Sequence, residues 1–399
     1  MQPRKQRIPV RPSLERLEDR SLLSAGNLGP VLTPHVAGLA GSAATQADPQ
    51  PVEQSALLPK LAATTPQVVP TVPPNGDLNP YGVAFVPDDF AAGGRLHPGD
   101  ILVSNFNDGA NLQGTGTTIV QVTPAGQQSV FFERQPGLGL TTALGILKSG
   151  FVLVGNVPTT TPRATCTQKA SGQETGVDQG SLLILDRQGH LVETLRNRQF
   201  LDGPWDLTVR DSSASIQVFV SNVLAGTVTR LDLALGSTSG ALRVTGTTQI
   251  ASGYAHRCDP NALVVGPTGV ALDAVHDTLF VASTGDNAIY AVSNAGTATT
   301  DHGPGTRFIN DPDHLHGPLA LAEAPNGHLI TSQGDAVNPD SNHPSEIVEY
   351  SASGRFVAQF SIDSAAGSAF GLALDSSEDG FRFAAVDDAT NVLDIWVVR

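Results

Sequence analysis

Oxygen-bearing side chains recur at one position of a strand pattern that appears six times along the chain. The second apolar strand of each segment ends in one of six such residues: Asn105, Asn156, Asn222, Ser283, Ser332 and Asp387. Carboxamide and carboxylate oxygens suit hard cations such as Ca²⁺, so the three asparagines and Asp387 are candidate ligands for a divalent cation. In the simpler interpretation, short polar side chains at strand ends bond neighbouring backbone groups and brace the fold.

Two histidines, His314 and His316, lie close together in the segment DPDHLHGP. A spacing of two puts both on one side of an extended segment, where imidazoles can bind a metal or act as a base. No third ligand follows from the sequence, and two solvated side chains in a turn are the alternative.

The loop Gln333–Glu346 is rich in acidic and amide side chains that can wrap a cation. It lacks the EF-hand spacing, which requires a glycine at the sixth position, and turn chemistry is the simpler account. The chain has no GxSxG nucleophile elbow and no phosphate-binding loop. The sequence therefore contains no complete catalytic set.

The chain has two cysteines, Cys166 and Cys258, and no CxxC pattern. A thiolate zinc site is therefore excluded. Both cysteines fall in loops that neighbouring segments place on one face, so we expect a Cys166–Cys258 disulfide, which suits an oxidising compartment. Two free thiols are the alternative.

The elements that must position these residues are short strands with period-two alternation. Each segment opens with a small-residue turn centred on one of Gly82, Gly145, Asp206, Gly269, Ala320 and Gly371. Three clear strands and a weaker fourth follow, which is the pattern of a propeller blade. We therefore predict an all-β, six-bladed β-propeller of four-stranded antiparallel blades over residues 76–399.

The first strand of each blade lines the central channel of such a fold. These strands begin with a partly aromatic set: Tyr81, Leu144, Trp205, Thr268, Leu319 and Phe370. Tyr81, Trp205 and Phe370 thus join the polar strand ends and the two histidines as candidates for a ligand-binding face. The sixth blade shows three strands, and the proline-containing stretch Val68–Pro74 is the candidate for its outermost strand.

Composition limits the function. Charged residues make up 15% of the chain and the formal net charge is −15, so binding to nucleic acid is not expected. No apolar run reaches the about 20 residues of a membrane span. Residues 1–25 are basic and targeting-like, and residues 26–75 form a low-complexity linker with little charge.

Two resemblances add to this reading. The stretch PTGVALDAVHDTLFVASTGDNAIYAV, residues 267–292, resembles an NHL repeat, and the fold is similar to that of SMP-30-like lactonases. That second resemblance implies a divalent ion held in the channel by Glu, Asn and Asp, but this chain has no Glu at an equivalent inner position, since Glu323 ends its strand at the opposite face. The segment LERLEDRSLLSA resembles the LEPR-XLL-type N-terminal motif of planctomycete exported proteins, which implies export; a short amphipathic helix is the alternative.

These observations predict a secreted or cell-surface propeller, monomeric, that acts as a binding module for a protein or a polysaccharide. The alternative is a divalent-metal-dependent lactonase or lyase of the SMP-30 or streptogramin-lyase type. A structural module of a cell-envelope assembly is a third reading.

Overall fold

Antiparallel strands dominate the chain because apolar and polar residues alternate with period two between turns rich in Gly, Asn and Asp. The structure is a computed structural model. It describes residues 56–399 apart from 135–136, 162, 170–173, 213–214, 237–240, 378–379 and 399. The targeting-like segment 1–25 lies outside the described residues.

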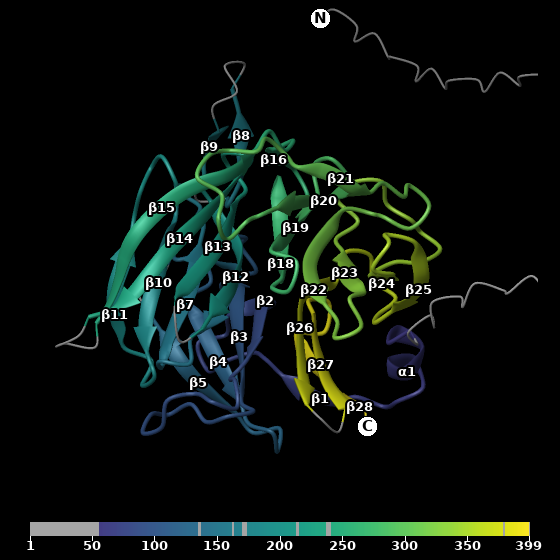
Figure 1. The fold of residues 1–399 in the computed structure, drawn as a ribbon. Coiled ribbons are helices and arrows are strands. Elements are labelled where there is room, and N and C mark those ends of the chain that lie inside the picture. Colours follow the sequence, from purple (N-terminus) through teal and green to yellow (C-terminus); the bar gives the residue numbers. More distant parts are fainter. Residues whose placement is uncertain are drawn as a thin grey trace, which may run out of the picture. The chain divides into compact units, whose positions relative to one another are not determined.

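The strands form six four-stranded sheets arranged as the blades of a propeller (Figure 1). Listed from the channel outwards, blade one contains β2 (Leu78–Phe85), β3 (Ile101–Asn107), β4 (Thr118–Val122) and β5 (Gln128–Glu133). Blade two contains β6 (Leu140–Ile146), β7 (Phe151–Asn156), β10 (Ser181–Asp186) and β11 (Leu191–Leu195). Blade three contains β12 (Pro204–Asp211), β13 (Ile216–Asn222), β14 (Thr227–Leu235) and β15 (Leu242–Ser252).

The other three blades repeat this order. Blade four contains β18 (Pro267–Asp273), β19 (Thr278–Ser283), β20 (Ala288–Ser293) and β21 (Thr306–Ile309). Blade five contains β22 (Pro318–Glu323), β23 (Leu329–Gln333), β24 (Glu346–Tyr350) and β25 (Phe356–Ser361). Blade six contains β26 (Ala369–Ser377), β27 (Gly380–Asp387), β28 (Val392–Val398) and β1 (Gln67–Pro70). The predicted all-β six-bladed propeller is confirmed.

The inner strands β2, β6, β12, β18, β22 and β26 contact one another in this order, and β26 contacts β2, so the ring is closed. Glycine at the centre of the opening turn permits this approach. A Cβ on Gly371 would lie 2.0 Å from the Tyr81 carbonyl oxygen, and a Cβ on Gly269 would lie 2.2 Å from that of Leu319. The small residue that marks each predicted turn is therefore required at these two blade contacts.

Strand β1 closes the ring, because it is the outermost strand of the blade that contains the C-terminal strand β28. Val69 pairs with Leu393, and Pro70, at the end of β1, pairs with Val392. The backbone N–H and the hydroxyl of Thr71 then both donate to the carbonyl of Asn391. The predicted closing strand is confirmed, and it ends four residues earlier and begins one residue earlier than the expected stretch Val68–Pro74.

A short helix, α1 (Leu58–Ala62), precedes β1 and packs against blades five and six. The carboxylate of Glu349, which is fully buried, accepts hydrogen bonds from the backbone N–H groups of Leu57 and Leu58. The His328 ring lies 2.7 Å from the same carboxylate. Part of the segment expected as linker, from Leu58 to Pro70, thus belongs to the propeller.

Six apolar clusters lie between neighbouring blades, and a seventh lies at one end of the channel. The cluster between blades one and two includes Leu102 and Leu144, for example, and the cluster between blades six and one includes Val103 and Ala384. A single blade cannot bury either of its two faces alone, so the twelve faces of the six blades are buried only in the closed ring. No helix in the described part of the chain is long and apolar enough to cross a membrane.

Candidate functional site

The central channel has two ends of different chemistry. One end, called here the loop face, carries the connections between blades and the loops between second and third strands. The other end, the hairpin face, carries the turns between first and second strands. A cavity of about 370 Å³ lies at the loop face, and a separate one of about 440 Å³ lies at the hairpin face.

Aromatic rings cluster at the loop-face cavity. The Tyr81 ring stacks on the rings of Phe370 and Phe106, with centroids 4.4 Å and 4.7 Å away, and meets the Trp205 ring edge-on at 5.8 Å. Tyr81, Trp205 and Phe370 all line the cavity. The structure thus brings together the three aromatic residues that the blade register placed at the starts of inner strands.

Three polar side chains in the wall of this cavity have atoms without hydrogen-bond partners among the described residues. They are Trp205 Nε1, Asn79 Oδ1 and Asp335 Oδ1, and each of these atoms is buried from solvent. A buried polar atom left unpaired costs about 1–3 kcal/mol. Since one donor and two acceptors share one cavity, they are suited to a ligand that both donates and accepts hydrogen bonds.

The charged groups of the loop-face cavity are acidic. Asp335 and Asp388 line it, and its lining residues include no Lys, Arg or His. Burial, with a smaller contribution from neighbouring Asp387, raises the pKa of Asp388 to about 6. Burial also raises the pKa of the Tyr81 hydroxyl, which is therefore a neutral group at neutral pH. The cavity favours neutral or cationic ligands over anions.

A disulfide joins two short strand pairs at this end of the channel, β8 (Thr167–Gln168) with β9 (Glu174–Thr175) and β16 (Arg257–Asp259) with β17 (Leu263–Val265), which together are called here the cover. Cys166 is bonded to Cys258, as the sequence predicted, with the two Cα atoms 5.3 Å apart. Cys258 lies in β16, which pairs with β17, while Cys166 precedes β8 and its partner β9. Figure 1 shows β8, β9 and β16 together at one end of the ring.

The cover contacts the aromatic cluster directly. Leu263 and Val264 of the cover pack in one apolar cluster with Tyr81 and Trp205, and Cys166 packs against it. Asn261, in the turn between β16 and β17, lines the cavity, and its carbonyl accepts a hydrogen bond of 2.9 Å from the Gln113 side chain of blade one. The disulfide therefore fixes part of the cavity wall.

The polar residues of the second strands lie elsewhere. None of Asn105, Asn156, Asn222, Ser283, Ser332 and Asp387 lines either channel cavity. The Asn156 amide donates to Ser181 in its own blade, and the Asn222 amide donates to the Phe200 carbonyl and to Thr229.

The remaining members of this set are bonded in a similar way. The Asn105 amide donates to the Thr71 carbonyl, and the Asn105 side-chain oxygen is buried and has no hydrogen-bond partner among the described residues. The Ser332 hydroxyl donates to the Phe370 carbonyl, Ser283 donates to Asp286, and the Asp387 carboxylate accepts from Ala389 and Thr390.

These contacts bear on the divalent ion that the lactonase resemblance implies. Its four expected oxygen donors lie in four different blades, where they bond backbone and hydroxyl groups instead of converging on the channel. The described residues also contain no group of three His, Cys, Asp or Glu side chains placed to hold a metal. The residues present do not fit such a centre, and no step of a mechanism is derived through it.

The two histidines contact different partners because residues 312–314 form a turn and not the extended segment that was expected. The His314 ring stacks on Phe356 with centroids 3.6 Å apart, and its Nδ1 lies 2.8 Å from Asp311. His316 is buried, and its Nε2 lies 3.5 Å from Glu346, a fully buried carboxyl whose pKa burial raises to about 8.

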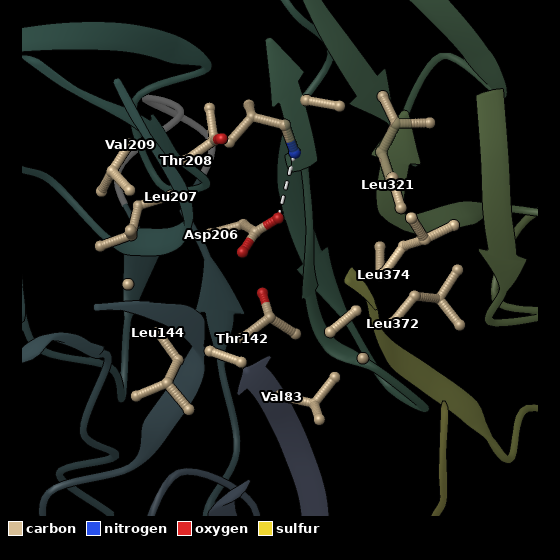
Figure 2. Close-up of a pocket in the computed structure, with 18 of the residues that line it drawn as sticks. Val83, Thr142, Leu144, Asp206, Leu207, Thr208, Val209, Leu321, Leu372 and Leu374 are labelled. Atoms are coloured by element: carbon tan, nitrogen blue, oxygen red, sulfur yellow. Dashed lines mark hydrogen bonds between the residues drawn. The ribbon is translucent and has the colours of Figure 1, made fainter. Parts of the chain in front are cut away.

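The hairpin-face cavity contains a carboxyl group that the site prediction from sequence omitted (Figure 2). Asp206 stands in blade three at the register position that five other blades fill with Gly or Ala. Its Oδ2 accepts a hydrogen bond of 3.0 Å from the backbone N–H of Val270 in blade four. Burial raises the pKa of Asp206 to about 7. The signal in the sequence was one acidic residue in register with five small ones.

Comparisons with known proteins concern the fold. No known protein family matches the chain, and no curated protein matches it. Among solved structures, the chain is similar to virginiamycin B lyase from Staphylococcus aureus, at 13% identity over 84% of this chain and 99% of that one, with a TM-score of 0.45. It is also similar to a gluconolactonase from Xanthomonas campestris, at 15% identity over 84% and 91%, with a TM-score of 0.46.

A third similar structure is regucalcin from Agrobacterium tumefaciens, described as a calcium-binding protein, at 13% identity over 83% of this chain and 94% of that one, with a TM-score of 0.47. At these values the likeness carries no argument about activity. The class that the fold defines is the six-bladed β-propeller.

Proposed function

We propose that this propeller is an exported binding module that holds a saccharide unit of a polysaccharide in the loop-face cavity. One observation carries the proposal: Trp205, Asn79 and Asp335 present unpaired, buried polar atoms in the wall of one cavity, next to stacked aromatic rings. The disulfide supports export, because such bonds persist in oxidising compartments.

A sugar ring suits this arrangement chemically. Its hydroxyl groups can accept from the indole N–H of Trp205 and donate to the oxygens of Asn79 and Asp335. Its C–H faces are apolar and pack on aromatic rings, and Phe370 is the partly exposed ring of the stack. The acidic lining admits neutral sugars and amino sugars and opposes sulfated or uronic acid units.

Calorimetric titration with cello-, xylo-, manno- and chito-oligosaccharides tests the proposal. Trp205→Phe keeps an aromatic ring but removes the pyrrole part of the indole with its N–H donor, so we expect about tenfold weaker binding of the oligosaccharide that binds the wild type. Trp396→Phe is the matched control, because the Trp396 N–H donates to the Thr64 carbonyl in another part of the ring. An equal loss of affinity in Trp205→Phe and Trp396→Phe would overturn the saccharide proposal, and so would a failure of the wild type to bind any of the four oligosaccharide series. Binding of a protein partner alone would assign the cavity to the other ligand class.

A second candidate function, lactone hydrolysis or a lyase reaction, is favoured by Asp388. Its carboxyl lines the cavity, and a pKa of about 6 suits a general base at neutral pH. Hydrolysis of glucono-1,5-lactone, measured with and without Ca²⁺, tests this candidate. Activity that falls at least a hundredfold in Asp388→Asn and rises with pH through 6 would support it. Activity that Asp388→Asn leaves unchanged would eliminate it.

A further inference from the structure

The hairpin-face cavity is a second pocket, open to solvent on one side and lined by residues of all six blades. Its wall consists of the later residues of the inner strands, and its volume of about 440 Å³ is large enough for a small organic molecule. Figure 2 shows an apolar collar around it, formed by residues from five strands: Val83, Leu144, Leu207, Leu321, Leu372 and Leu374. It shares no lining residue with the loop-face cavity.

Carboxyl groups interrupt this collar, and no basic residue lines the cavity. The three acidic residues of its lining are Asp206, Glu323 and Asp375. Arg382 of β27 neutralises Asp375, to which its guanidinium donates through Nε at 3.0 Å. Asp206 and Glu323 have no such ion pair within the described part of the chain. The cavity is therefore apolar and negatively charged at the same time.

The Asp206 carboxylate is held by hydrogen bonds and by no ion pair within the described residues, and the Leu207 N–H and the Thr142 side chain help the Val270 N–H to stabilise its charged form. Its Oδ2 accepts from the Val270 N–H, which braces blade three against blade four. The hydroxyl of Thr142 lies next to the carboxyl, but this hydroxyl donates to the Trp205 carbonyl (Figure 2). A brace between blades does not require a charge, because Ala320 and Gly269 fill the same register without one. The charge is the feature that a structural role leaves unexplained.

We propose that the hairpin-face cavity binds an organic ammonium ion, with its charged nitrogen beside Asp206 and its alkyl or aryl part against the leucine and valine collar, while Glu323 adds to the negative charge of the same cavity. An uncompensated carboxylate in an apolar cavity costs free energy, and a bound cation removes that cost. The apolar part of the ligand displaces water from the collar. This site is independent of the saccharide proposal, since the two cavities lie at opposite ends of the channel.

The proposal makes binding dependent on pH. Burial raises the pKa of Asp206 and of Glu323 to about 7, and Asp273 contributes to the shift of Glu323. The other charged groups near this pair are paired with each other: Asp375 with Arg382, and Asp273 with His276. At pH 5 about one in a hundred carboxyls with a pKa of 7 is ionised, so the preference for a cation should disappear there.

Isothermal titration with hexylammonium chloride and with 1-hexanol tests the proposal, because the two probes have equal chain length and differ in charge. At pH 8 we expect hexylammonium to bind at least tenfold more tightly than hexanol, and at pH 5 the two should bind within about twofold of each other. Asp206→Asn retains an acceptor for the Val270 N–H and should lower the preference for the cation at pH 8 about tenfold.

Glu323→Gln provides a second variant should Asp206→Asn fold poorly, and Glu193→Gln, on an exposed part of β11, is its matched control. Glu323→Gln should also weaken hexylammonium binding, and Glu193→Gln should not. Equal affinity for the two probes at pH 8, or a preference that neither cavity variant lowers, would overturn the proposal. Oligosaccharide binding that persists in Asp206→Asn would show that the loop-face site is independent of the hairpin-face site.

Discussion

Replacing Asp206 with Asn should make the protein more stable at pH 8 than the wild type and leave its stability at pH 4 nearly unchanged. The carboxyl has a pKa of about 7 in the folded protein against 3.8 for the unperturbed group, and burial causes the shift. A carboxyl whose folded pKa is raised contributes its full stability below the unfolded pKa. That contribution is lost as the pH rises towards the folded pKa, since folding then has to hold a charge that the unfolded chain hydrates.

The magnitude follows from the size of the pKa shift. Three pKa units at about 1.4 kcal/mol each give about 4 kcal/mol as the largest effect between pH 4 and pH 8. Asp206 borders a cavity and is only partly buried, so water offsets some of this cost and about 2–4 kcal/mol is the expected gain for the Asn variant. Asn keeps the brace, because its side-chain oxygen can accept the Val270 N–H.

Urea unfolding of both proteins at pH 4, 6 and 8, followed by tryptophan fluorescence, measures the difference in free energy of unfolding. Trp205 adjoins the mutated residue and Trp396 reports from blade six. The control is Asp375→Asn in the same cavity, which breaks the pair with Arg382 and should destabilise the protein at pH 8. If the two stability curves run parallel from pH 4 to pH 8, the carboxyl is hydrated in the folded protein. The electrostatic reasoning for the cavity then fails.

Two further predictions concern the ring. Replacing Cys166 and Cys258 together with Ser should lower the free energy of unfolding by about 4–5 kcal/mol on the chain-entropy estimate, because the bond closes a loop with a sequence separation of 92. An unchanged urea midpoint would contradict this. Gly371→Ala should destabilise by about 1–3 kcal/mol because its Cβ would overlap the Tyr81 carbonyl, whereas Ala320→Gly at the same register should cost no more than about 1 kcal/mol. A circular dichroism melt compares the two, and equal effects would refute the close-approach argument.

The sequence predicted the blades well where strands are buried on both faces. The inner strands are apolar runs preceded by a small-residue turn, and this pattern survives in all six blades. The fourth strands of blades three and four were not named from the sequence. β15 is half-exposed along its middle and reads TGTTQ there, so its alternation is weak, and β21 has four residues. An outermost strand buries one face at most, and its sequence is correspondingly less constrained.

The candidate site was predicted in part, and the reason lies in the position of each strand. Tyr81, Trp205 and Phe370 belong to inner strands and line the loop-face cavity. Leu144 has the same register but lines the hairpin-face cavity, so register places a residue at the channel and does not by itself decide the end. Asn105 and Asn156 belong to second strands, one strand further out, where a polar side chain meets the adjacent strand or blade. Asn79 was not in the predicted set although it belongs to β2, where its backbone takes a left-handed conformation with φ of 60°. Asp335 was missed because a loop carries it, and loop direction depends on contacts distant in sequence.

The two cavities share one electrostatic property that neither the blade pattern nor the net charge alone implies. Neither has a Lys, Arg or His among its lining residues, although the chain contains 23 Lys and Arg residues and 10 His residues. Adjacent residues of one inner strand separate the two chemistries: Trp205 lines the loop-face cavity with an unpaired N–H, and Asp206 lines the hairpin-face cavity with an unpaired charge. An anionic ligand is opposed at both ends of the channel, a hydroxyl-rich neutral ligand is satisfied at one, and a cation with an apolar tail is satisfied at the other. Because Gly occupies the Asp206 position in four blades and Ala in a fifth, the ring itself does not demand this asymmetry, and the two proposed ligands account for it.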